Sequence, residues 1–206
     1  MKRIDCVKIF ADIRRDELVI SGVAALTREL YAVAHRDTNL SQIQMGFVTP
    51  MALGLALALP QRKVVAMEGD GSALMSLGAF ATVANEGPKN LVMIIFDNGT
   101  YEGGGRHRTA TAGRARLEGI AKEAGIDRCL VARNLEEFQV ALKDVLWKDG
   151  PSLLVAKTEV IDPADDIPSQ PFDMTDCTYR FLKALAEEGL IQPWMEAVSA
   201  SHRPRT

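Results

Sequence analysis

Along this chain of 206 residues, short apolar runs typical of strands alternate with segments whose apolar residues have helical spacing. Short apolar or β-branched runs predict strands at residues 18–21, 63–67, 91–96, 129–132 and 152–157. Helical spacing of apolar residues predicts helices at 24–35, 50–59, 72–86, 117–124, 135–147 and 177–188. Strands that alternate with helices are typical of a parallel sheet covered on both faces. The predicted fold class is therefore α/β, a three-layer, doubly wound and mostly parallel sheet.

Composition narrows the class of protein. The chain is 47% hydrophobic and 25% charged with a formal net charge of -3, which is ordinary for a globular protein and provides no basic surface for nucleic acid. The most apolar stretch, residues 45–60, contains Pro50 and is too short for a membrane span. Phosphate recognition, if it occurs, must depend on local groups.

The cysteines indicate a reducing compartment. Cys6, Cys129 and Cys177 lie far apart and form no CxxC pair, so neither a disulfide framework nor a zinc site is expected. The charged N-terminal segment lacks the apolar stretch of a secretion signal. We therefore expect a cytoplasmic protein with reduced thiols.

Two predicted strands end in oxygen-rich, glycine-containing turns. Residues 69–72 read Gly-Asp-Gly-Ser, and residues 98–100 read Asn-Gly-Thr. Ligands of open parallel sheets bind outside the carboxyl ends of strands, where glycine lets the backbone approach a phosphate. Asp70 and Asn98 are far enough apart for one helix and a returning strand, and their oxygens suit Mg²⁺. The pattern predicts a metal-bridged diphosphate site, with an ordinary Asp-Gly turn as the alternative.

These residues also resemble a known family. The segment GDGSALMSLGAFATVANEGPKNLVMIIFDNGTY is similar to the thiamine-diphosphate motif, which opens with GDG and closes with an asparagine after a helix and a strand. The preceding QMGFVTPMALGLALALPQRKVVAMEGDG resembles acetolactate synthases, benzoylformate decarboxylase and, most closely, phosphonopyruvate and sulfopyruvate decarboxylases. The resemblance covers residues 18–157. It implies a thiamine diphosphate-binding fold in residues 1–160, with 161–206 as a linker, terminal helix and tail packed on the same domain.

The resemblance implies a role for each matching residue. The metal Mg²⁺ would be bound by Asp70, by the side chain of Asn98 and by the carbonyl of Thr100. Met45 would lie under the thiazolium ring and hold the cofactor in its bent form. Further cofactor contacts are implied for Ser21, Gly22, Ile43, Gly69, Gly71, Ser72 and Tyr101, although many relatives carry glycine where this chain has Ile43.

A partner chain is implied as well. In this family a glutamate from a separate pyrimidine-binding domain activates the cofactor, and the 69 residues before Asp70 are too few for a second α/β domain. The resemblance therefore implies an alpha-type subunit that supplies the catalytic glutamate. We expect a hetero-oligomer, and a homo-oligomer when this chain is alone.

The implied reaction is non-oxidative decarboxylation of a small 2-oxo acid by a lyase. Glu102, Arg106, His107 and Arg108, in a glycine-rich segment at 101–116, are candidate substrate contacts, with His107 as an acid or base; a solvated connector is the alternative. Carboligation, as in acetolactate synthase, and a non-catalytic regulatory subunit remain open. Oxidation is disfavoured because the sequence has no cysteine cluster for iron–sulfur ligation. Rossmann and P-loop nucleotide-binding domains are disfavoured because neither of their glycine motifs occurs.

Overall fold

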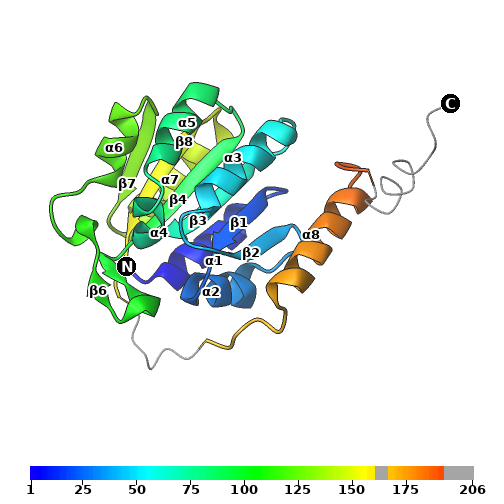
Figure 1. The fold of residues 1–206 in the computed structure, drawn as a ribbon, viewed down its shortest axis with the longest axis horizontal. Helices are drawn as coiled ribbons and strands as arrows, with labels where there is room; N and C mark the ends of the chain where they lie inside the picture. Colours follow the sequence, from blue (N-terminus) through cyan, green and yellow to red (C-terminus); the bar gives the residue numbers. More distant parts are fainter. Residues whose placement is uncertain (161–166, 193–206) are drawn as a thin grey trace.

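The computed structural model describes residues 1–160 and 167–192, which fold around one six-stranded parallel sheet. The strands are β1 (Leu18–Gly22), β2 (Asn39–Ile43), β3 (Val64–Gly69), β4 (Leu91–Asp97), β7 (Arg128–Ala132) and β8 (Ser152–Lys157). Their order across the sheet is β2-β1-β3-β4-β8-β7 (Figure 1). The predicted α/β class with a parallel sheet is confirmed.

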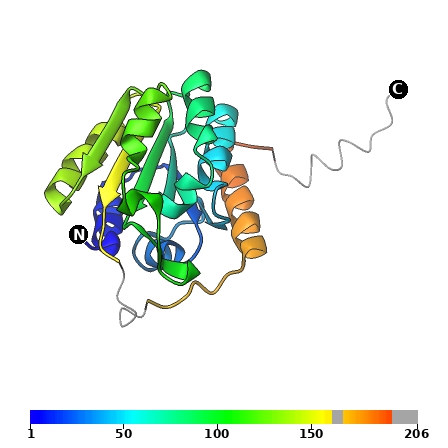
Figure 2. The same cartoon turned by 60° about the vertical axis from the view of Figure 1, so that its left-hand side comes forward.

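Helices cover both faces of the sheet (Figure 2). One face packs against α1 (Arg3–Ile13), α2 (Ala25–Ala34) and α7 (Leu135–Trp147). The other face packs against α3 (Val48–Ala58), α4 (Asp70–Leu74), α5 (Gly78–Glu86), α6 (Leu117–Glu123) and α8 (Met174–Glu187). Because both faces are covered, every residue of the central strand β4 is buried, which explains its continuous apolar run.

Helix α1 and strand β2 were missed by the sequence analysis. Helix α1 buries Cys6, Val7 and Phe10 at helical spacing beneath charged neighbours, so its apolar stripe is narrow. Strand β2 reads Asn-Leu-Ser-Gln-Ile and carries polar residues because it is the edge strand. Its polar side chains meet the C-terminal segment: Gln42 Nε2 donates to the carbonyl of Phe172 at 2.8 Å.

The helix predicted over 72–86 is two helices. Helix α4 ends at Leu74, and α5 begins at Gly78. Between them the N–H groups of Met75 and Ser76 bond three residues back, to Ser72 and Ala73, which tightens the turn and redirects the chain. Met75 is thereby turned outward and is 59% exposed.

The glycine-rich segment at 101–116, for which no helix or strand was predicted, contains regular structure. Strands β5 (Thr100–Tyr101) and β6 (His107–Arg108) form a short antiparallel ribbon. Two 3₁₀ turns, η1 (Glu102–Gly104) and η2 (Ala110–Ala112), accompany it. The ribbon lies at the carboxyl end of the sheet (Figure 1).

The C-terminal segment returns to the first half of the chain. Helix α8 is capped by Asp173, whose Oδ1 accepts from the N–H of Asp176 at 2.9 Å, and it contacts β2. Phe181 and Leu185 join the core on the same side of the sheet as α3. Residues 161–166 of the predicted linker and 193–206 of the predicted tail lie outside the described residues.

The strand order fixes where a ligand can bind. The chain passes from β1 to β2 on one side and then to β3 on the other, so the topology reverses between β1 and β3. A crevice forms at such a switch point, outside the carboxyl ends of the strands. No helix in the described ranges 1–160 and 167–192 has the length and apolarity needed to cross a membrane.

Candidate functional site

A cavity of about 540 Å³ opens at this switch point. It is lined by the ends of β1, β3 and β4, by the start of α2, and by the ribbon of β5 and β6. The predicted site residues among its lining are Gly22, Met45, Gly69, Asp70, Gly71, Ser72, Asn98, Thr100, Tyr101 and His107. The topology therefore gathers residues from four distant parts of the sequence.

Asp70 is the first residue of α4 and follows β3 directly. Its Oδ2 accepts hydrogen bonds from the hydroxyls of Thr109 and, at 2.8 Å, Thr111. Burial raises the pKa of Asp70 above its ordinary value, and the nearby carboxylate of Asp97 raises it further. The bonds from Thr109, Thr111 and the backbone of Asn98 oppose this shift and hold the carboxylate in one orientation.

A second buried carboxylate stands beside Asp70. The hydroxyl of Thr111 also lies 2.8 Å from Asp97 Oδ1, so one side chain contacts both acids. Lys157, at the end of β8, forms an ion pair with Asp97 Oδ2. Lys157 therefore balances the charge of Asp97, whereas Asp70 accepts hydrogen bonds from the uncharged hydroxyls of Thr109 and Thr111.

Asn98 and Thr100 form the facing tip. Asn98 Oδ1 accepts from the N–H of Thr100 at 2.9 Å, which makes an Asx turn directly after β4. The strand pairing puts Gly69 opposite Phe96, so the tips after β3 and β4 are adjacent. Among the described residues, no three His, Cys, Asp or Glu side chains gather as a metal cluster. Any metal here would depend on one carboxylate with amide and carbonyl oxygens.

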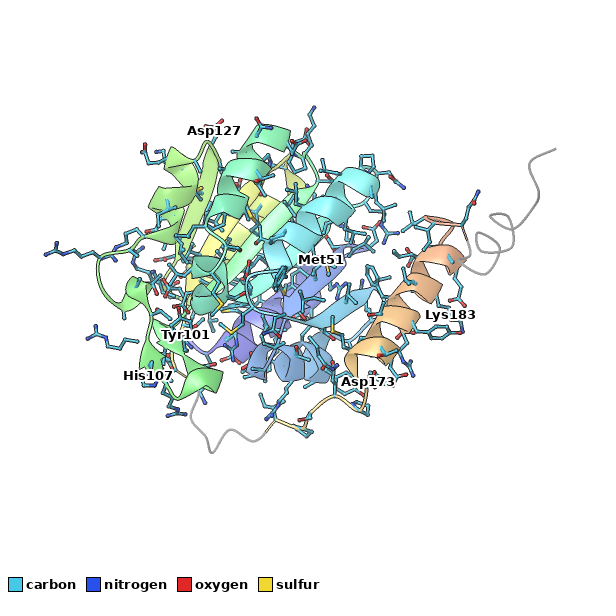
Figure 3. The ribbon with its side chains drawn as sticks, viewed as in Figure 1. Met51, Tyr101, His107, Asp127, Asp173 and Lys183 are labelled. Carbon is cyan, nitrogen blue, oxygen red and sulfur yellow. The ribbon has the colours of Figure 1, made fainter. Side chains whose placement is uncertain are left out.

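Gly71 lies directly under the ring of Tyr101. A Cβ at Gly71 would stand 2.5 Å from Cδ1 of Tyr101, which leaves no room for a larger residue. The second glycine of the Gly-Asp-Gly sequence is thus required by close packing of the β5 side chain. Figure 3 shows Tyr101 and His107 at this same end of the molecule.

Ser72 connects two walls of the cavity. Its Oγ accepts from the N–H of Gly46 at 3.0 Å and donates to the carboxylate of Glu68. Glu68 also accepts from the hydroxyl of Thr49 in α3. Burial raises the pKa of Glu68, while the bonds from Ser72 and Thr49 lower it. The hydroxyl of Ser72 is therefore engaged in holding the segment next to Met45.

Two predicted cofactor contacts do not line the cavity. The side chain of Ile43 is 1% exposed and belongs to the core under α3. Ser21 is fully buried, and its hydroxyl has no hydrogen-bond partner among the described residues. Its neighbour Gly22 does line the cavity.

The candidate substrate contacts separate into two groups. Glu102 and His107 line the cavity, whereas Arg106 and Arg108 are exposed outside its lining. Arg108 donates to the carbonyl of Ala112 at 2.8 Å. Glu102 accepts from Arg3 in α1 at 3.1 Å.

Four residues of the site were missed by the sequence analysis: Thr109, Thr111, Glu68 and Arg3. The two threonines are buried within an otherwise exposed polar segment, and their i, i+2 spacing was the one available signal. Glu68 is the penultimate residue of the apolar strand β3, directly before the Gly-Asp-Gly sequence, and a buried carboxylate there is unusual. Arg3 gave no signal because its partners are distant in sequence.

Comparison with known proteins places these features in one family. Residues 30–156 match the family described as "Thiamine pyrophosphate enzyme, C-terminal TPP binding domain". The chain is 34% identical over 187 residues to the sulfopyruvate decarboxylase subunit beta of Methanocaldococcus jannaschii, covering 89% of this chain and 97% of that one. It is also 36% identical over 148 residues to the phosphonopyruvate decarboxylase of Streptomyces viridochromogenes, covering 71% of this chain and 37% of the relative.

The fold has counterparts among solved structures. A putative thiamin diphosphate-dependent enzyme from Mycobacterium smegmatis superposes with a TM-score of 0.68 at 24% identity, covering 77% of this chain and 32% of that chain. This likeness supports the fold, and the sequence matches establish the relationship. The chain therefore belongs to the thiamine pyrophosphate enzymes as a C-terminal TPP binding domain, in the family that includes the sulfopyruvate decarboxylase beta subunits.

Proposed function

We propose that this chain binds the diphosphate of thiamine diphosphate through Mg²⁺ as one subunit of a non-oxidative 2-oxo acid decarboxylase, in the cytoplasm. One observation carries the proposal: Asp70, Asn98 and Thr100, from two neighbouring strand ends, line one cavity at the topological switch point. The relatives named as sulfopyruvate and phosphonopyruvate decarboxylases indicate the reaction class.

The donor set fits a magnesium ion. The carboxylate of Asp70, the amide oxygen of Asn98 and the carbonyl of Thr100 are hard oxygen ligands, and Mg²⁺ completes its shell with water and phosphate oxygens. A divalent cation would also offset the cost of a buried ionised Asp70, whose pKa is raised by burial. Thr109 and Thr111 would orient the carboxylate from behind.

The chain's other residues would position the cofactor. When bound, thiamine diphosphate supplies the electron sink for decarboxylation of the 2-oxo acid. Met45 would offer an apolar surface to the thiazolium, and the N–H groups of Gly71 and Ser72 would bind the phosphates. Gly22 would contact the phosphate at the turn that it forms with the buried Ser21, Tyr101 would add a cofactor contact, and the carbonyl of Ile43 would accept from the aminopyrimidine. His107, exposed at the rim, would exchange a proton with the substrate.

A partner subunit would complete the site. The relative from Methanocaldococcus jannaschii is named subunit beta, and we propose an alpha-type subunit that supplies the catalytic glutamate. Phe47 and Met51 are 61% and 39% exposed at the start of α3, and Met75, which lines the cavity, is 59% exposed. This apolar patch is a suitable contact for the partner and would drive self-association of the chain alone.

Calorimetric titration tests the proposal. Thiamine diphosphate is titrated into the purified chain with and without Mg²⁺, and with and without a candidate alpha-type subunit. We expect binding that requires Mg²⁺ and strengthens with the partner. Equal binding with and without Mg²⁺ would refute the proposal. Absence of binding in every combination would also refute it and would favour a non-catalytic regulatory subunit.

Product analysis then fixes the reaction. The assembled subunits are supplied with sulfopyruvate, phosphonopyruvate, benzoylformate and pyruvate, and CO₂, aldehyde and condensed products are measured. Decarboxylation predicts CO₂ and the aldehyde in equal amounts. A condensed hydroxyketone as the main product would assign the chain to carboligation instead.

The position of the partner can be tested separately. Phe47→Glu places a charge in the exposed patch and should weaken assembly with the alpha-type subunit, as measured by analytical ultracentrifugation. Val140→Glu is the matched control, because Val140 is 67% exposed on α7, on the opposite face of the sheet. Equal assembly of both variants would remove the patch as the contact.

A further inference from the structure

A buried arginine from α1 reaches the same cavity. Arg3 is 6% exposed and lines the cavity beside the start of α2. Among the described residues that line the cavity, it is the one lysine or arginine. An anion entering the cavity therefore meets Arg3 as its source of fixed positive charge.

One side of the guanidinium is held firmly. Arg3 Nε donates to Glu29 Oε2 at 2.6 Å, and Nη2 reaches Glu29 Oε1 at 3.5 Å. Glu29 belongs to α2 and is 2% exposed. A buried two-point pair of this kind fixes both the position and the orientation of the guanidinium.

The other side of the guanidinium faces a more accessible partner. Arg3 Nη1 donates to Glu102 Oε2 at 3.1 Å, and the Glu102 side chain is 17% exposed. Glu102 begins the η1 turn and is followed by Gly103, Gly104 and Gly105, so its backbone is lightly constrained. Both Arg3 and Glu102 line the cavity.

We propose that Arg3 is an anion-binding residue of this cavity, and that the bound anion replaces the carboxylate of Glu102 at Nη1. Glu29 stays in place and keeps the guanidinium oriented toward the cavity, whereas Glu102 moves aside with its glycine-rich turn. This inference deepens the proposed function, because the identity of the anion rests on that function. The anion is a tetrahedral oxyanion, carried either by the cofactor as diphosphate or by the substrate as a sulfonate or phosphonate.

The chemistry favours exchange at Glu102. Two carboxylates contact one guanidinium, and the carboxylate of Glu102 opposes an incoming anion at Nη1. Displacement of Glu102 removes that opposition and leaves a charge-assisted bond from Nη1 to the ligand. The N–H groups at the start of α2, where Ala24, Ala25 and Leu26 also line the cavity, favour an anion at the same place.

The test uses the full chain and two unreactive probes, inorganic pyrophosphate for the cofactor and 3-sulfopropionate for the substrate. Each is titrated calorimetrically into wild type, Glu102→Gln and the double variant Arg3→Met with Glu29→Met. The double variant replaces the buried pair as a unit, so that no charge is left without its partner. Glu86→Gln, exposed at the end of α5, controls for the change in net charge.

We expect Glu102→Gln to bind at least one probe about tenfold more tightly and the double variant to bind it about tenfold more weakly. Glu86→Gln should match wild type. Weakening for pyrophosphate assigns Arg3 to the cofactor's diphosphate, and weakening for 3-sulfopropionate assigns it to the substrate.

Three results would overturn the assignment. These are unchanged binding of both probes by a double variant that still unfolds cooperatively, weaker binding by Glu102→Gln, and no binding of either probe by wild type. A chain that binds a probe through Arg3 but does not bind thiamine diphosphate with Mg²⁺, whether alone or with the alpha-type subunit, would refute the proposed function and leave this inference standing.

Discussion

The backbone N–H of Gly46 donates to the hydroxyl of Ser72 across 3.0 Å. This bond joins the segment that carries Met45 to the helix that begins at Asp70. The same hydroxyl donates to Glu68, so a short chain of hydrogen bonds runs through the floor of the cavity. The spacing between Met45 and Asp70 is thus set by side-chain contacts as well as by the sheet.

Ser72→Ala should destabilise the cofactor-free chain. It leaves the N–H of Gly46 and one oxygen of Glu68 without the bonds they now have, which costs about 1–3 kcal/mol for buried groups. Urea unfolding followed by circular dichroism measures the change. Ser76→Ala, a half-buried serine in the next turn, is the control, and an equal effect of the two substitutions would contradict this role of Ser72.

Gly71→Ala should be destabilising because its Cβ would collide with the ring of Tyr101. We expect a loss of about 1–3 kcal/mol, as for other overpacked sites, together with weaker cofactor binding. In a double-mutant cycle the substitution should cost less in a Tyr101→Ala background. Gly78→Ala, whose Cβ would meet no atom within 4 Å, should be neutral or slightly stabilising; a similar penalty there would point to backbone effects instead.

Asp70→Asn should separate stability from function. Because burial raises the pKa of Asp70, an ionised carboxylate at this position costs stability at neutral pH, and a neutral amide removes that cost. The variant should unfold at the same or a higher urea concentration than wild type, yet lose Mg²⁺-dependent binding of thiamine diphosphate in calorimetry. Retained Mg²⁺-dependent affinity would remove Asp70 from the metal site.

Cys6 and Cys129 should react slowly in the folded chain. Burial raises the pKa of Cys6 to about 12 and that of Cys129 to about 11, so very little of the reactive thiolate forms near pH 8. Alkylation by iodoacetamide, followed by mass spectrometry, should be much slower in buffer than in urea, where the pKa returns to about 8.5. The rate in buffer should still rise between pH 8 and pH 9. Equal rates in buffer and urea would show that these thiols are accessible.

The sequence predicted those helices and strands whose apolar residues stand out clearly from their polar neighbours. The helix at 135–147 and the strand at 152–157 were predicted with their observed bounds, because their apolar residues are clearly spaced. Helix α1 and strand β2 were missed, since charged residues surround the one and polar residues fill the other. Their burial depends on segments distant in the sequence, which no local window contains.

The sequence by itself determined the chemistry of the cavity's floor. A carboxylate and an amide after two neighbouring strands, with glycines beside them, were sufficient to predict oxygen ligands at one edge of a parallel sheet. Strand spacing alone brings such residues together, because parallel strands end at the same edge.

Tertiary structure decided which partners these groups have. It placed Thr109 and Thr111 on Asp70, directed the hydroxyl of Ser72 toward Glu68, and brought Arg3 to Glu102 across almost half of the chain. Such contacts follow from how the layers pack, and a hydrogen bond between residues far apart in sequence leaves no periodic signal. The chain therefore encodes the side chains of the site locally, whereas their orientation and charge balance arise only when the sheet and its helices are assembled.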